Sequence, residues 1–422
     1  PLRPFGPPPP HAGEEKKRRA REPAMAAAEN YAMTAEDERQ MLDAIGKWIE
    51  KKVAPVAMEL EHADEWPTEL VEDMKDLGLF GALIEPEYGG LGLSATTYSK
   101  IVMMIAEEWM SLTGIFNSHL MMAQIVQRFG TEKQKQYWLP KFATGEIRGG
   151  LGLTEPDAGT DLQAIRTTAK RVGEKYVVEG AKTWISNAIQ GQACALLVKT
   201  DPKAEPRYKG MSILIVCKID PDTGEALPGI RNGKKLEKLG YKGIDSGEFV
   251  FDGYECDAEL SLVGGEEGKG FFMATGGLEI GRINIAARSV GIAKRALRES
   301  IAYAQTRKTM GKPICEHQAI QLKLGKMGAK TRAAELLVED AARAYDTGER
   351  IDMEAGMAKY FASETAVEVA TEAMRIHGGY GYSKEYVIER LYRDAPLMCI
   401  GEGTNEMQRI IIAKQLVKRN PV

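Results

Sequence analysis

The chain has 422 residues, 44% of them hydrophobic, which is enough for two or three domains with large buried cores. Its 56 basic and 60 acidic residues give a formal net charge of -4, so the charge balance does not favour nucleic acid as a partner. No apolar run approaches the ~20 residues of a membrane-spanning helix, so no membrane segment is expected.

The five cysteines and five histidines are scattered along the chain. The cysteines are odd in number and include no CxxC pair, which favours a reducing compartment over a disulfide framework. The histidines form no HxxxH pair and have no cysteine cluster nearby. We therefore predict no metal site.

Residues 1–30 are predicted to be a disordered N-terminal tail. The proline run at residues 7–10 and the charged stretch EEKKRRARE at residues 14–22 cannot build a buried core. The tail lacks the apolar stretch of a secretory signal, and its acidic residues fit a mitochondrial presequence poorly. We favour a bacterial, cytoplasmic protein and expect the mitochondrial matrix if the source is eukaryotic.

Residues 34–149 have the hydrophobic spacing of an N-terminal helical domain. Thr34 with Asp37, and Thr131 with Gln134, resemble capping boxes that begin helices. Gly78 and Gly130 are expected to end helices. The expected helices cover residues 34–49, 67–78, 94–110 and 113–129, and a further helix follows Thr131.

Residues 150–263 show short β-rich runs separated by turn signals. The predicted strands include residues 176–178, 193–198, 211–217 and 248–251. This pattern predicts a middle antiparallel β-domain, either a barrel or a sandwich.

Residues 264–422 return to helical spacing, with helices expected over residues 278–307, 317–345, 354–377 and 404–416. Long antiparallel helices with short links favour a C-terminal four-helix bundle. The fold class is therefore α+β, with helices, a sheet and helices in that order. No repeated βα units occur, which counts against a Rossmann fold.

Three segments carry candidate chemistry. In LTEPDAGTD (153–161), a polar turn offers hydroxyl and N–H groups that can hold a flavin edge and a diphosphate, although ordinary polar loops look similar. In KTWISN (182–187), Trp184 can cover a planar cofactor or belong to the core. In CIGEGTNE (399–406), Glu402 between two glycines can approach a ligand closely or act as a helix cap.

Together, the order and spacing of these segments resemble the acyl-CoA dehydrogenase family over residues 34–418. Three further pieces match in order: Gly281-Arg282, the run RKTMGKP (307–313) with EHQ (316–318), and HGGYGY (377–382). The resemblance implies a homotetramer built as a pair of dimers, with FAD between the middle and C-terminal domains and a neighbouring subunit completing each FAD site.

The resemblance also assigns FAD contacts by position. From one subunit they are Leu153, Thr154, Thr160, Trp184 and Ser186. A second group would contact FAD partly across the subunit interface: Arg307, Thr309, Gln318, Arg375, Gly379, Thr404 and Glu406. A guanidinium pairs well with a diphosphate, which gives Arg307 a clear physical role.

By the same resemblance, Glu402 removes the α-proton of an acyl-CoA thioester, hydride leaves the β-carbon for flavin N5, and the product is a trans-2-enoyl-CoA. Some relatives place the base just before the arginine matched by Arg282, but Gly281 stands there and cannot act as a base. Glu279, Arg282 and Gly401 are the expected substrate contacts. An electron-transfer flavoprotein is the expected electron acceptor.

Two positions bear on the acyl group. Gly401 stands where tyrosine is common in the family, which predicts space for a branched or bulky acyl group. No arginine lies between Trp109 and His119, where relatives acting on dicarboxylic acyl-CoAs commonly have one nearby, and this disfavours a glutaryl-type decarboxylating enzyme. His119 is expected to be a packed or hydrogen-bonded histidine.

Four alternatives remain open from the sequence. An acyl-CoA oxidase would pass its electrons to oxygen. A flavoprotein of this type with a non-dehydrogenase role, such as DNA binding, would keep the fold. The partial fingerprint Gly90-x-Gly92-x-x-Ala95 is a weak sign of nicotinamide binding. A non-catalytic scaffold would have kept the motifs without the activity.

Overall fold

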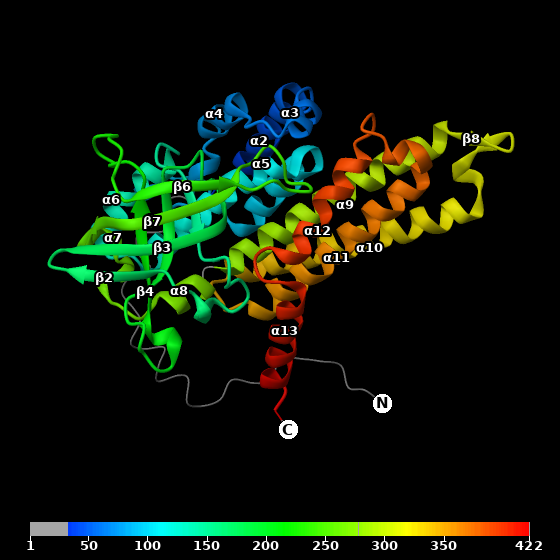
Figure 1. Cartoon of the computed structure of the whole chain (residues 1–422). Helices are drawn as coiled ribbons and strands as arrows, with labels where there is room; N and C mark the ends of the chain where they lie inside the picture. Colours follow the sequence, from blue (N-terminus) through cyan, green and yellow to red (C-terminus); the bar gives the residue numbers. More distant parts are fainter. Residues whose placement is uncertain (1–32, 277, 422) are drawn as a thin grey trace. The chain divides into compact units, whose positions relative to one another are not determined.

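The computed structural model describes residues 33–276 and 278–421 (Figure 1). The predicted disordered tail lies outside these described residues. The chain divides into residues 1–40 and a large unit of residues 41–422. In the first unit, Thr34 begins helix α2 (Ala35–Trp48): the Asp37 N–H donates to Thr34 Oγ1 at 3.1 Å, and the Asp37 carboxylate accepts from the Thr34 N–H and hydroxyl.

The N-terminal part of the large unit is helical, as predicted. The Gln134 N–H donates to Thr131 Oγ1, and the Thr131 N–H donates to Gln134 Oε1, so the predicted capping box is present. Gly78 follows the end of α4 with φ +70°, a conformation that favours glycine. The elements are a short π-helix (Ile49–Val53), α3 (Ala57–Ala63), α4 (Thr68–Asp76), α5 (Ala95–Phe129) and α6 (Glu132–Ala143).

Helix α5 is broken at Trp109, which has φ -152° and ψ 100°. The two helices predicted for residues 94–129 are therefore two straight pieces joined by a kink. The break removes helical hydrogen bonds, because the carbonyls before it lose their i+4 donors. Arg295 donates to the Glu107 carbonyl at 3.4 Å, and Arg390 donates to the Glu108 carbonyl.

The predicted packing of His119 is confirmed. Its ring is fully buried and lies edge-on to the rings of Phe80 and Phe142, with centroids 5.4 and 5.7 Å away. Its Nε2 is 2.9 Å from the Phe142 carbonyl oxygen. Burial lowers the pKa of His119 to about 4, so the ring is neutral near pH 7.

A seven-stranded sheet follows the helices, with the order β1-β4-β2-β3-β7-β6 and β5 paired to the other edge of β4. The four predicted strands lie within β3, β4, β5 and β7. The strands are β1 (Gly149–Gly152), β2 (Thr168–Val172), β3 (Lys175–Ser186), β4 (Ala193–Lys199), β5 (Met211–Cys217), β6 (Ile230–Lys235) and β7 (Ser246–Asp257).

The sheet is mixed rather than purely antiparallel. Strands β1 and β2 both pair with β4 in parallel, whereas the β2–β3, β3–β7, β4–β5 and β6–β7 pairs are antiparallel as predicted. Strands β4 and β5 are buried on both faces: Leu196 and Val216 belong to the core inside the sheet domain, and Leu197 and Ile215 belong to the core shared with the helices. Because both faces are covered, these strands are continuous apolar runs.

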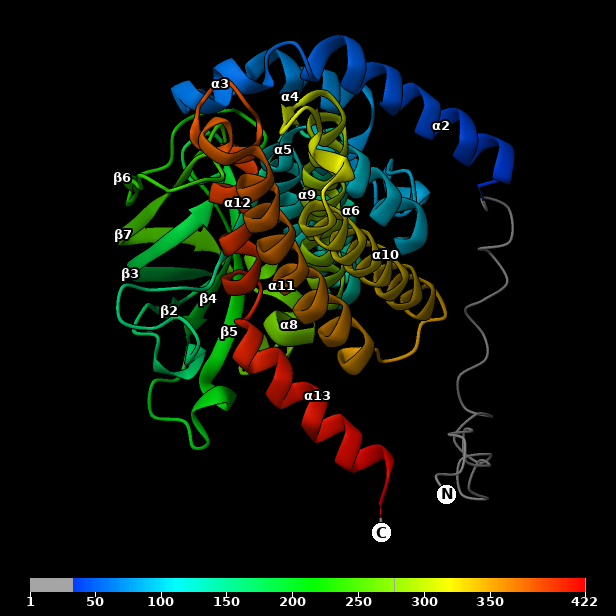
Figure 2. The same cartoon turned by 90° about the vertical axis from the view of Figure 1, so that its right-hand side faces the viewer.

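The C-terminal part is a bundle of α9, α10, α11 and α12 (Figure 1). The predicted four-helix bundle is present, but its fourth helix is α12, which the sequence pattern missed. Helix α13, which was predicted as the fourth helix, packs beside α11 and extends away from the bundle (Figure 2). The helices are α8 (Gly270–Gly276), α9 (Leu278–Thr306), α10 (Gln318–Asp346), α11 (Asp352–His377), α12 (Ile388–Ile400) and α13 (Asn405–Arg419).

Helix α12 was missed because its buried face carries charged residues and its interior contains Pro396. Arg390 and Asp394 are both buried, one turn apart, so the apolar periodicity that marks a helix is interrupted. A hairpin of β8 (Lys308–Thr309) and β9 (Lys312–Pro313) links α9 to α10. Within residues 33–276 and 278–421, no helix has the length and apolar character needed to cross a membrane.

The depressed pKa of His119 predicts a pH-dependent part of stability. Between about pH 6.5 and pH 4 the unfolded chain binds a proton at His119 that the folded chain excludes, so the free energy of unfolding should fall as pH falls through this window. His119→Gln should make that slope smaller, which denaturant unfolding at a series of pH values measures. An unchanged slope in the variant would contradict a neutral, buried His119.

Candidate active site

Glu402 lies on a strained turn between α12 and α13. Its φ is +55°, a left-handed conformation that costs a residue with a side chain about 1–3 kcal/mol. Gly403 follows with φ +84°. The buried side chain of Gln408 donates to the carbonyls of Glu402 and Gly403 at 3.3 and 3.1 Å, which holds the turn from α13.

The alternative role of Glu402 as a helix cap is not what the structure shows. Thr404 is the N-cap of α13, and its hydroxyl accepts a hydrogen bond from the Met407 N–H at 3.4 Å. Among the described residues, neither the carboxylate nor the backbone N–H of Glu402 has a hydrogen-bond partner. Both groups are therefore available to a ligand.

The Glu402 carboxylate faces helix α9 at Gly281. A Cβ atom at Gly281 would lie 3.1 Å from Glu402 Oε2 and 3.1 Å from the Met121 sulfur. The two positions considered for the base thus face the same space, and glycine at one leaves room for the carboxylate of the other.

Burial and nearby charges shift the pKa of Glu402 in opposite directions. Burial raises the pKa of its carboxyl, and the positive charges of Arg288, Arg282 and Lys359 lower it, Arg288 most strongly. The carboxylate is therefore more basic than an exposed glutamate, while nearby cations stabilise its ionised form.

Lys359 anchors the polypeptide on both sides of this turn. Its fully buried ammonium donates to Asn405 Oδ1 at 2.7 Å and to the Cys399 carbonyl at 3.2 Å. The Asn405 amide in turn donates to Ser363 and Glu364 on α11. Burial lowers the pKa of Lys359 to about 8. Sequence analysis missed this residue, although polar positions in an alanine-rich buried helix were a visible signal.

The three residues predicted to contact substrate have different surroundings. Arg282 is buried, and its Nη1 forms an ion pair with Asp352 at 3.6 Å; among the described residues, neither Nε nor Nη1 has a hydrogen-bond partner. Glu279 accepts from the Ile351 N–H at 3.3 Å and lines a pocket of about 360 Å³. A Cβ at Gly401 would lie 4.0 Å from Ile285 on α9.

The two middle-domain motifs lie side by side. The buried ammonium of Lys182 pairs with the Glu155 carboxylate at 2.9 Å and donates to the Leu153 carbonyl. The Thr183 N–H donates to the Thr154 carbonyl at 2.9 Å. This ion pair joins the segment at residues 153–161 to the end of β3, where Ser186 and Trp184 are found.

Trp184 is 60% exposed and has φ +60°, which is rare for a bulky side chain. The β3–β7 register shifts between Lys182 and Ile185, and this irregularity turns the indole out of the sheet. An exposed aromatic face on a strained backbone fits a planar cofactor. Ser186 ends the same strand two residues further along, and Thr160 is exposed on the segment at residues 153–161.

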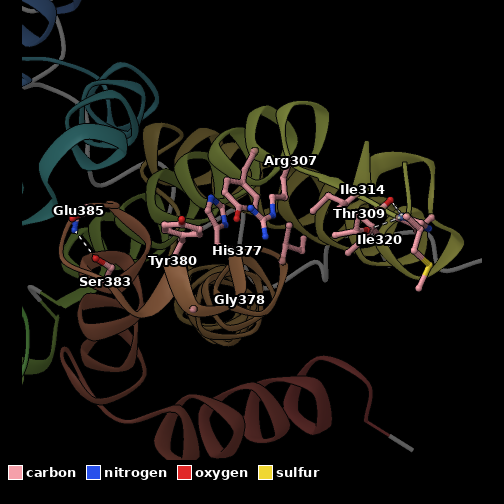
Figure 3. A pocket seen from close by; sticks show the side chains of 14 residues that line it. Arg307, Thr309, Ile314, Ile320, His377, Gly378, Tyr380, Ser383 and Glu385 are labelled. Carbon is pink, nitrogen blue, oxygen red and sulfur yellow. Dashed lines mark hydrogen bonds between the residues drawn. The ribbon is translucent and has the colours of Figure 1, made fainter. Parts of the chain in front are cut away.

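A second part of the expected FAD set surrounds a pocket of about 730 Å³ at the end of the bundle (Figure 3). Arg307, Thr309 and Gly379 line it, together with His377 and Tyr380. The Arg307 guanidinium lies 5.9 Å from the centre of the Tyr380 ring and has no ion pair in the part of the chain that the structure describes. A diphosphate would supply the missing anion.

The remaining expected FAD residues do not line this pocket. Gln318 begins α10, and the 63% exposed side chain of Arg375 pairs with Glu372. Thr404 caps α13, and Glu406 pairs with Arg409 at 3.0 Å. The hairpin of β8 and β9 lies at the end of the bundle remote from β3 (Figure 1). One chain therefore holds the expected FAD contacts around Trp184 and those around Arg307 in separate places.

The three parts of the chain match the domains of one known family. Models of the acyl-CoA dehydrogenase N-terminal, middle and C-terminal domains match residues 35–146, 150–254 and 268–417. The chain is 38% identical to a 3-(aryl)acrylate reductase of Clostridium sporogenes (strain ATCC 15579), over 88% of this chain and 96% of the relative. It is 37% identical to an acyl-CoA dehydrogenase of Bacillus subtilis (strain 168), over 90% of this chain and 98% of the relative.

The fold has close counterparts among solved structures. Butyryl-CoA dehydrogenase from Megasphaera elsdenii superimposes with a TM-score of 0.85 at 34% identity, covering 92% of this chain and all of the other. The three domain matches, these identities and the shared fold lead to one conclusion. The chain belongs to the acyl-CoA dehydrogenase family, whose members are FAD flavoproteins.

Proposed function

We propose that the chain is an FAD-dependent dehydrogenase that oxidises an acyl-CoA thioester to the trans-2-enoyl-CoA, with Glu402 as the base. The observation that carries the proposal is the strained turn, which holds a carboxylate and a backbone N–H without protein partners against Gly281. Such strain is retained where the surrounding structure enforces it, commonly at active sites.

In this mechanism the α-C–H bond breaks and its proton passes to Glu402. The Glu402 N–H, which has no partner among the described residues, would donate to the thioester oxygen, where negative charge develops. Bound FAD would supply the two-electron acceptor for the β-hydride, so that the substrate loses one proton and one hydride in all. A raised pKa suits Glu402 to proton abstraction near neutral pH.

The expected FAD residues support a cofactor shared between copies of the chain. Trp184, Ser186 and Thr154 would hold the flavin end, and Arg307 and Thr309 of a neighbouring copy would hold the diphosphate end. Their separation on one chain favours the homotetramer implied by the resemblance (Figure 1). The electrons then pass to an electron-transfer flavoprotein. Peroxide formation during turnover in air would instead indicate an acyl-CoA oxidase.

Glu402→Gln should bind FAD and acyl-CoA but reduce the flavin at least ~10³-fold more slowly, because the amide cannot take the α-proton. The measurement is anaerobic bleaching of the flavin band by a panel of acyl-CoAs from butyryl to palmitoyl, including isobutyryl and isovaleryl. Bleaching by the variant at the wild-type rate would exclude Glu402 as the base.

The pH profile of the wild-type protein is the companion to that test. Because burial raises the pKa of Glu402, the rate of flavin reduction should fall as pH is lowered through a value above that of an exposed glutamate. The same fall should be absent from the residual rate of Glu402→Gln. A residual rate with the wild-type profile would assign the titration to another group.

Arg307→Ala should weaken FAD binding by about 10- to 100-fold, because a charge-assisted hydrogen bond contributes roughly 1.5–3 kcal/mol. Arg343→Ala is the matched control: its exposed guanidinium pairs with Glu339 and Asp340 on its own helix, outside the pocket lining, so FAD binding should be unchanged. Titration of the apoprotein with FAD measures both. Equal losses in the two variants would contradict a specific role of Arg307 in binding the diphosphate.

Gly401→Tyr should shift the substrate preference from branched to straight acyl groups by about tenfold or more. The backbone tolerates the change, because φ at Gly401 is -66° and a Cβ there makes ordinary contacts with Leu397 and Ile285. The ratio of kcat/KM for isobutyryl-CoA and butyryl-CoA measures the effect. An unchanged ratio would separate Gly401 from the acyl pocket.

A further inference from the structure

Arg288 on α9 is a buried cation that forms no ion pair with a carboxylate in the described part of the chain. Its side chain is 3% exposed. One terminal nitrogen donates to the Tyr241 hydroxyl and the other to the Thr113 carbonyl, both at 3.3 Å, and Nε has no partner in the described part of the chain. Buried charges are normally paired, because an isolated ion loses its hydration on burial.

Three other buried or partly buried arginines have a carboxylate that pairs with them or raises their pKa. Arg282 has Asp352 at 3.6 Å, and Arg393 binds Glu61 through two hydrogen bonds of 2.6 and 2.9 Å. Arg390 has the buried Asp394 one turn along α12. Burial lowers the pKa of Arg390, and the charge of Asp394 opposes that effect. Among residues 33–276 and 278–421, no carboxylate forms an ion pair with Arg288.

Arg288 belongs to the face of α9 that carries the space next to Glu402. Gly281, Asn284 and Arg288 are spaced by three and four residues and so share one side of the helix. Gly281 meets the Glu402 carboxylate, and Arg288 lies two turns further along, about 10 Å by helical rise. Of the three cations that act on Glu402, Arg288 acts most strongly.

The surroundings of Arg288 are polar and incompletely bonded. Asn284 donates to the Tyr98 hydroxyl at 2.8 Å, Tyr98 donates to Asn117 Oδ1 at 3.0 Å, and Asn284 Oδ1 has no partner. Tyr241 reaches Arg288 because Gly114 has no side chain: a Cβ there would lie 1.7 Å from the Tyr241 hydroxyl oxygen. Purely hydrocarbon surroundings would not need this set of polar groups.

We propose, building on the proposed function, that Arg288 binds the distal carboxylate of a dicarboxylic acyl-CoA whose thioester lies at Glu402. The free Nε and an adjacent terminal nitrogen form the fork that a carboxylate accepts in two parallel hydrogen bonds. The cation expected on α5 for such a substrate is absent from residues 109–119, and α9 supplies one that touches this segment at Thr113.

A structural role gives a different expectation. If Arg288 only braces α5 and Tyr241, its removal would lower stability and affect every acyl-CoA alike. Arg295 on the same helix offers the matched control, because it braces α5 at the Glu107 carbonyl and is paired with Glu108 and Glu299.

The experiment compares glutaryl-CoA with pentanoyl-CoA, which has the same acyl carbon count without the second carboxylate. Binding is measured by calorimetric titration on FAD-loaded Glu402→Gln, where turnover does not interfere, and kcat and KM are measured on the wild-type background. Glutaryl-CoA should bind at least tenfold more tightly than pentanoyl-CoA. Arg288→Met should weaken the binding of glutaryl-CoA by about 10- to 100-fold and leave the binding of pentanoyl-CoA unchanged or tighter. Arg288→Lys should keep part of the preference for glutaryl-CoA.

Equal affinity for the two thioesters in the Glu402→Gln protein would overturn the proposal, as would equal losses for both in Arg288→Met and Arg295→Met. If Arg288→Met does not fold, the ratio of affinities for glutaryl-CoA and pentanoyl-CoA in the protein that keeps Arg288 tests the proposal by itself. Failure of the proposed function is a separate result: no acyl-CoA would then bleach the flavin, while the binding ratio of glutaryl-CoA to pentanoyl-CoA still reports on Arg288.

Discussion

The need to hold one carboxylate without a protein partner shapes the centre of this molecule. Glu402 sits in a left-handed conformation, and its ionised form is stabilised by cations rather than by a direct ion pair. Such a group is unfavourable in an isolated turn, because both the backbone strain and the partial loss of hydration oppose it. The turn persists because Lys359 and Gln408 fix it from α11 and α13.

Buried polar groups recur wherever helices meet around this turn. The kink at Trp109 opens carbonyls in α5, and arginines from α9 and α12 bind them. Arg393 on α12 pairs with Glu61 on α3 and with Glu389 on its own helix. These contacts join the N-terminal helices to the bundle through charged hydrogen bonds, which specify one arrangement more narrowly than apolar packing alone.

The sheet domain holds its candidate residues by buried contacts of its own. The buried pair of Lys182 and Glu155 ties the segment at residues 153–161 to β3, and the register shift in β3 turns Trp184 outward. The indole is thus presented by an interior strand of the sheet rather than by a connecting loop. Placement on a rigid element is what a cofactor ring requires, because its reactive edge must stay aligned with the substrate.

Local features were predictable from the sequence. Capping boxes at Thr34 and Thr131, the end of α4 at Gly78 and the apolar runs of β4 and β5 depend on neighbouring residues or on burial alone. The motifs containing Trp184, Arg307 and Glu402 could be singled out for the same reason, since each is a short run with an unusual combination of residues.

Other features depend on partners that are distant in the chain. The parallel pairing of β1 and β2 with β4, the charged and buried helix α12, and the positions of Arg288 and Lys359 were not predictable, because a charged residue looks solvent-facing until its buried neighbours are known. The sequence by itself determined the order of helices and strands and the candidate motifs, since these follow from local propensity and spacing. The tertiary structure alone decided which charges are buried, which are paired and which are left for a ligand, since burial and pairing arise only when distant elements pack together.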